Sequence, residues 1–250
     1  MDLFLKGKTA IVTGASQGIG RAITKELALE GVKVFATARN ENLLNSLKDE
    51  ILTAGGTVPE TFIQNFVSPD GPQNIADMAL ARLKNVDILI NNAGHSCPVD
   101  VIAEDEPWIN SMRLDFESPR QLTQLILPHF IERRQGCILN LTSSYELRSV
   151  NVSAIAKGAV ALWSKQLATQ LGQYGIRVNC LQPGLIDTEN IRPFFQGEDG
   201  KKFASREIPL GTFGHPQDMA NMATFLVSPR AQYITGTVVV VDGGMRHSPF

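Results

Sequence analysis

Three glycines near the N-terminus have the spacing of a phosphate-binding turn. Gly14, Gly18 and Gly20 follow a short apolar run at residues 9–12 and precede a helical pattern at residues 21–27. A strand, a glycine-containing turn and a helix in this order place a pyrophosphate at the N-terminus of the helix. Gly14 permits the tight turn, Gly18 lets the backbone approach the phosphate, and Gly20 lets the helix pack close to the sheet. The stretch predicts a dinucleotide-binding site, although glycine triplets also occur in ordinary turns.

The end of the next predicted strand, at residues 33–38, bears on which dinucleotide binds. An acidic side chain at this place holds the ribose hydroxyls of NAD(H), but here Ala38 is followed by Arg39. A guanidinium cannot accept hydrogen bonds from those hydroxyls, whereas it pairs well with a 2′-phosphate. Arg39 therefore favours NADP(H) over NAD(H). The alternative is that Arg39 is an ordinary solvated surface cation.

The elements that position these residues alternate between strand and helix along the chain. Short apolar runs predict strands at residues 9–12, 33–38, 58–63, 86–90, 136–142, 176–181 and 237–241. Helical spacing between them predicts helices, one of them a single long helix over residues 107–134. This alternation predicts one domain over residues 1–250, an α/β doubly wound Rossmann-like fold whose mainly parallel sheet of about seven strands has helices on both faces. Residues 188–213 lack a clear pattern, and we interpret them as a substrate lid or, alternatively, a surface loop.

Composition and charge indicate a protein that acts on a small molecule. With 43% hydrophobic and 19% charged residues, the chain is typical of globular proteins. A formal net charge of −2 gives no indication of binding to nucleic acid or to an anionic membrane. No apolar run has the length of a membrane span, and residues 1–6 lack the pattern of a signal peptide.

The three cysteines bear on metal binding and on the cellular compartment. Cys97, Cys137 and Cys180 lack the spacing of metal ligands, so we expect no metal site. Their odd number favours free thiols in a reducing compartment, and we therefore expect a cytoplasmic protein.

Three motifs together resemble one family. Residues 13–20 read TGASQGIG, residues 91–94 read NNAG after a predicted strand, and residues 183–188 read PGLIDT after a later strand. In sequence and order they resemble the classical short-chain dehydrogenases/reductases, and the resemblance covers nearly the whole chain. It implies an oxidoreductase that transfers hydride between a nicotinamide cofactor and a ketone or alcohol. It also implies a homo-oligomer, a tetramer or a dimer, built through the helices near residues 107–134 and after residue 152.

The resemblance also implies where the cofactor is bound. The glycine-rich stretch would surround the pyrophosphate, Arg39 the 2′-phosphate, and Asn65 the adenine, where the family more often has aspartate. Residues 92–94 would lie on the adenosine ribose side, and the third motif would hold the nicotinamide amide. The residues expected to bind NADP(H) are Gly14, Ser16, Gln17, Gly18, Ile19, Gly20, Arg39, Asn65, Asn92, Ala93, Gly94, Lys157, Pro183, Gly184, Ile186 and Thr188.

The catalytic positions match the family only in part. The resemblance implies a serine that polarises the carbonyl, at Ser143, and a lysine that holds the nicotinamide ribose, at Lys157. In the family a tyrosine four residues before the lysine, on the same helix face, transfers the proton. That position holds Ser153 here, after a loop about three residues shorter than usual. The helix asparagine that supports a water relay in the family is replaced by Asp115.

The absence of the tyrosine leaves the proton donor open. The aliphatic hydroxyl of Ser153 is a much weaker acid than a phenol, so it is a poor donor at neutral pH, and losing a positioned acid typically costs about 10²- to 10⁴-fold in rate. Tyr145, close after Ser143, is a candidate to bring a phenol into that place; alternatively it is a surface or packing tyrosine. Asp115 is a candidate proton relay or a charge that favours a cationic substrate, or else a buried carboxylate that bonds backbone amides.

The sequence is therefore compatible with three hypotheses for the function. The first is an NADP(H)-dependent short-chain oxidoreductase for a ketone, including a 3-oxoacyl-type substrate, with a non-standard or impaired proton donor. The second is an imine or iminium reductase on the same fold, because hydride addition to such a carbon needs no acid to protonate an alkoxide. The third is a non-catalytic NADP(H)-binding protein or an oligomer partner. The first hypothesis is the one we expect.

Overall fold

A seven-stranded sheet forms the centre of the protein, whose computed structural model describes residues 1–144, 149–195 and 197–247. The strand order is β3-β2-β1-β4-β5-β6-β7, and every neighbouring pair is parallel. The strands are β1 (Thr9–Thr13), β2 (Lys33–Ala38), β3 (Glu60–Ile63), β4 (Ile88–Asn91), β5 (Gly136–Leu141), β6 (Ile176–Pro183) and β7 (Val238–Val241). The predicted doubly wound α/β fold is confirmed.

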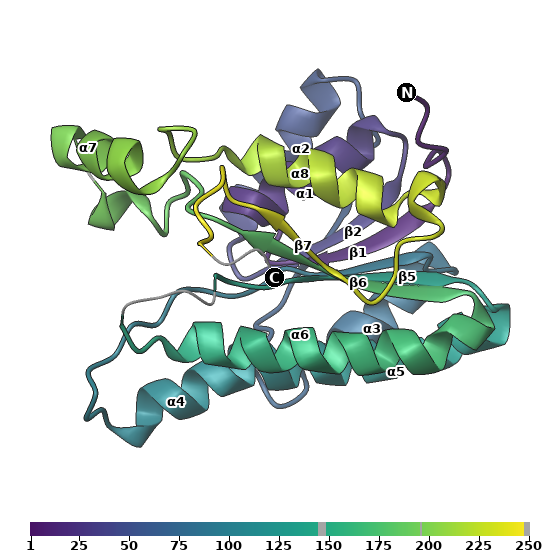
Figure 1. The fold of residues 1–250 in the computed structure, drawn as a ribbon. Coiled ribbons are helices and arrows are strands. Elements are labelled where there is room, and N and C mark those ends of the chain that lie inside the picture. Colours follow the sequence, from purple (N-terminus) through teal and green to yellow (C-terminus); the bar gives the residue numbers. More distant parts are fainter. Residues whose placement is uncertain (145–148, 196, 248–250) are drawn as a thin grey trace.

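Helices cover both faces of the sheet (Figure 1). On one face lie α1 (Gly18–Leu29), α2 (Glu41–Thr53) and α8 (Pro216–Val227). On the other lie α3 (Gly71–Leu83), α4 (Asp105–Met112), α5 (Ser118–Arg133) and α6 (Val152–Leu171). The short helices are η1 (Arg113–Glu117), η2 (Gly172–Tyr174), η3 (Arg192–Phe194) and η4 (Pro229–Ala231). None of the helices in the described ranges combines the length and the apolarity needed to cross a membrane.

The central strand β1 contributes to two separate apolar cores. Because successive side chains of a strand point to opposite faces, Ala10 and Val12 pack in the core that contains Met219 of α8. Ile11 packs in the other core, which contains Leu122 of α5. Burial on both faces explains why the strands appear in the sequence as nearly continuous apolar runs.

Two segments differ from the sequence-based expectation. The single helix predicted over residues 107–134 is divided into α4, the π-helical η1 and α5, and the π turn buries Asp115. A π turn adds a residue to one turn without a distinct sequence pattern, so apolar spacing did not reveal it. The predicted lid at residues 188–213 contains η3 and the helix α7 (Gly197–Glu207). Gly200 and Ala204 are the residues of α7 that are buried, too few for an apolar stripe.

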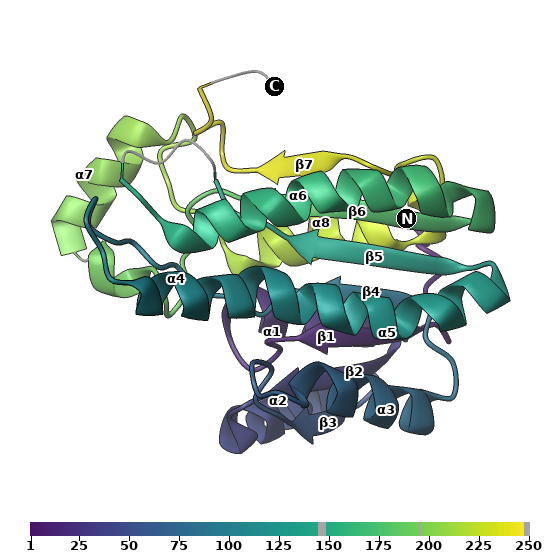
Figure 2. The ribbon, with the colours of Figure 1, turned by 90° about the horizontal axis from the view of Figure 1, so that it is seen from below.

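The strand ends define where a ligand can bind. All the strand arrows point toward the same end of the molecule, which is the end that carries α7 (Figure 2). Strand β1 pairs with β2 on one side and β4 on the other, so the chain order reverses direction at β1. In open α/β sheets the crevice outside the carboxyl ends at such a point is the usual ligand site.

Candidate active site

A cavity of about 750 Å³ opens at the carboxyl ends of the central strands. All the residues that the sequence predicts to bind NADP(H) line it, and so do the catalytic candidates Ser143, Ser153 and Lys157. Asp115 lies behind the lining, and Tyr145 falls outside the described residues. The structure therefore brings the two halves of the predicted site into one space.

The glycine turn forms one wall of the cavity. Gly18 has a φ of +53°, which a residue with a side chain adopts only with strain, and it begins α1. A Cβ on Gly20 would overlap the carbonyl oxygen of Gly14 and the amide nitrogen of Asn92. Gly20 therefore lets the start of α1 approach the residues that directly follow β1 and β4.

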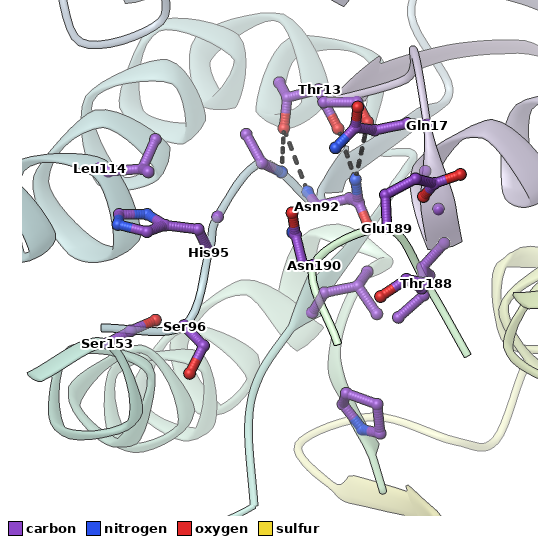
Figure 3. A pocket seen from close by; sticks show the side chains of 18 of the residues that line it. Thr13, Gln17, Asn92, His95, Ser96, Leu114, Ser153, Thr188, Glu189 and Asn190 are labelled. Carbon is purple, nitrogen blue, oxygen red and sulfur yellow. Dashed lines mark hydrogen bonds between the residues drawn. The ribbon is translucent and has the colours of Figure 1, made fainter. Parts of the chain in front are cut away.

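Asn92 ties the loop after β4 to the glycine turn (Figure 3). Its Nδ2 donates to the carbonyl oxygens of Thr13, at 2.9 Å, and Gly14, at 3.2 Å. In return, Thr13 Oγ1 accepts hydrogen bonds from the backbone nitrogens of Asn92 and Ala93, both at 3.1 Å. Sequence reasoning missed Thr13 as a positioning residue, although a hydroxyl at the end of a strand beside a glycine turn is a recognisable signal.

Buried polar side chains fix α6 against the sheet. Asn91 Nδ2 donates to Asn140 Oδ1 at 2.8 Å and to Thr123 Oγ1 at 3.0 Å. Asn140 Nδ2 donates to Ser164 Oγ at 2.8 Å. These bonds join β4, β5, α5 and α6, and they hold the helix that carries Lys157 beside the cavity.

Lys157 and Asp115 form a buried ion pair. Lys157 Nζ donates to the Leu141 carbonyl at 3.0 Å and lies 3.6 Å from Asp115 Oδ1. Burial raises the pKa of Asp115, whereas the Lys157 ammonium, the Ser153 hydroxyl and His95 act in the opposite direction. Within the described ranges, neither Asp115 oxygen accepts a hydrogen bond of ordinary geometry. Among the described residues, no backbone amide donates to Asp115, as the interpretation of it as a carboxylate bonded to backbone amides would require.

Gly94 leaves room for this pair. A Cβ on Gly94 would lie 2.5 Å from Asp115 Oδ1 and 2.8 Å from Lys157 Nζ. The backbone of the loop after β4 therefore lies directly against both charged groups. The sequence placed Gly94 only near the cofactor, because the approach of η1 and α6 to this loop is a tertiary contact.

Two loops that are distant in sequence meet beside Ser153. Asn151 Nδ2 donates to Ser96 Oγ at 2.9 Å, and the Asn151 side chain also caps the N-terminus of α6. The backbone nitrogen of Val152 donates to the carbonyl of Cys97 at 3.0 Å. Ser96 and Asn151 line the cavity, and sequence reasoning missed both because each depends on the other loop for its position.

Charged side chains also lie at the cofactor end of the cavity. Arg39 is exposed and lines the cavity, and within the described ranges no hydrogen bond or ion pair engages its guanidinium. Glu189, which sequence reasoning missed, lies beside Gln17 and Thr188 (Figure 3). Its Oε2 is 3.6 Å from the position of a Cβ on Gly18, at the N-terminus of α1.

No group of three or more His, Cys, Asp or Glu residues in the described part of the chain is arranged to hold a metal ion.

Sequence comparison finds relatives along the whole chain. A family model described as enoyl-(acyl carrier protein) reductase matches residues 14–246. The 3-oxoacyl-(acyl-carrier-protein) reductase FabG of Thermotoga maritima is 30% identical over 249 residues, which cover 96% of this chain and 98% of that protein. The 7alpha-hydroxysteroid dehydrogenase of Escherichia coli is 34% identical over 246 residues, covering 97% of this chain and 96% of that protein.

Solved structures show the same likeness in three dimensions. L-sorbose reductase from Gluconobacter frateurii, complexed with NADPH and L-sorbose, has a TM-score of 0.92 and 29% identity, covering 99% of this chain and 100% of that chain. A 7 alpha-hydroxysteroid dehydrogenase complexed with NADH and 7-oxo glycochenodeoxycholic acid has a TM-score of 0.91 and 33% identity, covering 97% of this chain and 96% of that chain. These two structures hold different nicotinamide cofactors, so the likeness does not choose between NADPH and NADH.

Proposed function

Because this chain belongs to the short-chain dehydrogenase/reductase family, we propose that it is an NADP(H)-dependent oxidoreductase acting on a ketone or the corresponding alcohol. The observation that carries the proposal is that one cavity joins a glycine-lined dinucleotide cradle to Ser143, Ser153 and Lys157. NADP(H), when bound, supplies or accepts the hydride. The preference for a 3-oxoacyl-type ketone is supported by the FabG relatives.

The residues of this chain have separate tasks in the proposed reaction. Ser143 donates a hydrogen bond to the substrate oxygen and so polarises the carbonyl. Lys157 holds the nicotinamide ribose and thereby orients the reacting carbon atoms. Ser153 occupies the place of the family's tyrosine, but its hydroxyl is too weak an acid to protonate an alkoxide efficiently. The non-standard proton donor is therefore part of the proposal.

Oxidation of NADPH by the purified protein tests the proposed activity. Parallel panels of simple ketones, 3-oxoacyl thioesters and cyclic imines are compared, with Lys157→Ala as the control variant. We expect turnover of a ketone or thioester, and a loss of about 10²-fold or more in Lys157→Ala because the ribose is no longer held in place. Equal turnover by both proteins would remove Lys157 from the proposed mechanism.

The preference for NADP(H) is supported by the exposed guanidinium of Arg39 at the end of β2. A charge-assisted pair with a 2′-phosphate is strong, so Arg39→Ala should weaken NADPH binding about 10- to 100-fold while NADH binding changes little. Fluorescence titration with both cofactors measures this. A similar loss for NADH, or none for NADPH, would contradict the assignment.

Imine or iminium reduction is the second candidate, favoured by Asp115. Its buried carboxylate lies 3.6 Å from the Lys157 ammonium, so the pair neutralises the charge that would otherwise stabilise an alkoxide. A nearby carboxylate favours a cationic substrate, and an iminium carbon accepts hydride without a proton donor. Faster turnover of the cyclic imines than of the ketones in the panels above would select this reaction.

The proposal also includes a homo-oligomer, a tetramer or a dimer, and a cytoplasmic location. The oligomer is supported by apolar side chains left exposed on α4 and α6, namely Ile109, Ile155 and Leu162. Sedimentation of the purified protein distinguishes it from a monomer. The location is supported by three free cysteines, two of them buried, which suit a reducing compartment.

A further inference from the structure

His95 is fixed beside the reacting groups through its neighbour on one side. It directly follows Gly94, whose backbone lies against both members of the buried pair. A Cβ on Gly94 would be only 2.5 Å from Asp115 Oδ1 and 2.8 Å from Lys157 Nζ. His95 is therefore the next residue after the one whose backbone contacts this pair. It acts against the rise in the pKa of the Asp115 carboxyl.

The residues that follow His95 are held against the start of α6. Ser96 Oγ accepts a hydrogen bond from Asn151 Nδ2 at 2.9 Å, and the Cys97 carbonyl accepts one from the Val152 backbone at 3.0 Å. Ser153, at the position of the family's tyrosine, comes next on that helix. Figure 3 shows the His95 side chain on the same side of the cavity as Ser153 and Leu114, away from Glu189 and Thr188.

His95 is also accessible to solvent, and it lines the cavity. An imidazole, unlike a serine hydroxyl, commonly acts as a general acid and base in enzymes, and exposure lets it exchange protons with water. The charged groups that lie against the neighbouring Gly94 in the described part of the chain are Asp115 from η1 and Lys157 from α6.

We propose that His95 is the general acid and base that replaces the family's tyrosine, and this inference rests on the proposed function. In reduction, hydride from NADPH forms a bond to the carbonyl carbon, and the electron pair of the C=O π bond moves to oxygen. The N–H proton of the His95 imidazolium passes to that oxygen, directly or through the Ser153 hydroxyl. The products are NADP⁺, an alcohol and neutral imidazole, which then takes a proton from water. In oxidation His95 accepts the proton.

Substitution of His95 tests the proposal against the other candidate donor. In His95→Gln we expect kcat for reduction to fall by about 10²- to 10⁴-fold while the dissociation constant for NADPH, measured by fluorescence, changes less than about twofold. Free imidazole should restore part of the activity. Tyr145→Phe tests the other candidate donor, and if His95 gives the proton, the larger loss of kcat should appear in His95→Gln.

The pH dependence of kcat and chemical modification of His95 distinguish a catalytic role from a purely structural one. The dependence of kcat on pH should differ between the unmodified protein and His95→Gln, because the glutamine side chain cannot act as a general acid or base. Diethyl pyrocarbonate modifies exposed imidazoles, and mass spectrometry locates the modified histidine. Saturating NADP⁺ with the product alcohol should protect His95 from modification, and NADP⁺ alone should protect it less.

The outcomes separate this inference from the proposed function. If His95→Gln keeps its kcat while Lys157→Ala loses it, the protein is an oxidoreductase and the assignment of His95 is wrong. If Tyr145→Phe loses kcat instead, the donor is Tyr145, and the assignment of His95 is again wrong. If the unmodified protein oxidises no NADPH with any substrate class, the proposed function fails, and the inference fails with it.

Discussion

At the scale of single residues, Asp115 determines the electrostatics of the site. Its carboxylate lies 3.6 Å from the Lys157 ammonium, and its side chain is fully buried. An ionised carboxylate at this distance cancels much of the positive charge that would stabilise an alkoxide. Ketone reduction in this cavity then depends on a proton donor from another residue, whereas iminium reduction does not.

The titration of Asp115 predicts how stability depends on pH. Burial raises its pKa, so the folded protein binds this proton more tightly than the unfolded chain. Between the ordinary and the raised values the folded state keeps a proton that the unfolded chain has released, and the free energy of unfolding therefore falls as pH rises. Asp115→Asn lacks this titration. The free energy of unfolding of the unmodified protein minus that of Asp115→Asn should fall as pH rises from about 4 toward neutrality.

Urea unfolding of both proteins at a series of pH values measures that difference. Asn is close to Asp in size, so most other contributions cancel between the two proteins. A difference that stays constant or increases with pH would mean that Asp115 is readily ionised in the folded protein.

Individual residues were predictable where a motif fixes them to a strand end. Ser143 and Lys157 line the cavity as expected, because one follows β5 and the other faces the sheet from α6. Ser96 and Asn151 were not predictable, because they reach the cavity only through the hydrogen bond between their loops. The burial of Asp115 beside Lys157 was equally hidden, since it depends on how η1, α6 and the Gly94 loop pack.

At the scale of elements, the segment after β6 controls access to the glycine turn. Thr188 and Glu189 lie over Gly18, and the Glu189 carboxylate lies near the N-terminus of α1. That N-terminus attracts anions, and it is the proposed site of the pyrophosphate. A negative side chain there competes with the phosphate groups of the proposed cofactor or repels them.

Removal of the Glu189 charge should therefore tighten cofactor binding. The interaction of an exposed charge with a helix end contributes up to about 1 kcal/mol. We therefore expect the dissociation constant for NADPH to be about twofold to fivefold lower in Glu189→Gln than in the unmodified protein. The matched control is Glu198→Gln on α7, where the carboxylate is exposed and pairs with Lys201. Fluorescence titration of both variants measures the effect. Weaker binding in Glu189→Gln would show that the carboxylate assists the cofactor.

The elements themselves were predictable to different degrees. Strands that are buried on both faces appear as apolar runs in the sequence. Their succession along the chain and their approximate bounds therefore follow from the sequence. The helix α7 was missed because it buries only Gly200 and Ala204. The π turn η1 was missed because the apolar spacing on either side of it is that of an ordinary helix.

At the scale of the whole molecule, the parallel sheet brings distant motifs to one edge. The glycine turn after β1, the loop after β4 and the segment after β6 all lie at the carboxyl ends of strands, and all line the cavity. That the residues of the three motifs line one cavity could be predicted for this reason. The substrate half depends on contacts among residues 94–97, 115 and 151–157, which the fold class alone does not specify.

Transfer of deuterium from NADPH to a product shows whether the protein catalyses hydride transfer. The protein is incubated with NADPH deuterated at C4 of the nicotinamide on the transferred face, and with the ketone, 3-oxoacyl thioester and imine panels, and the products are analysed by mass spectrometry. Even slow turnover is detected, because each event leaves one deuterium on carbon. We expect deuterium at the former carbonyl or imine carbon, and its loss in Lys157→Ala. Tight binding of NADPH without deuterium in any product would contradict the account and identify a non-catalytic nucleotide-binding protein.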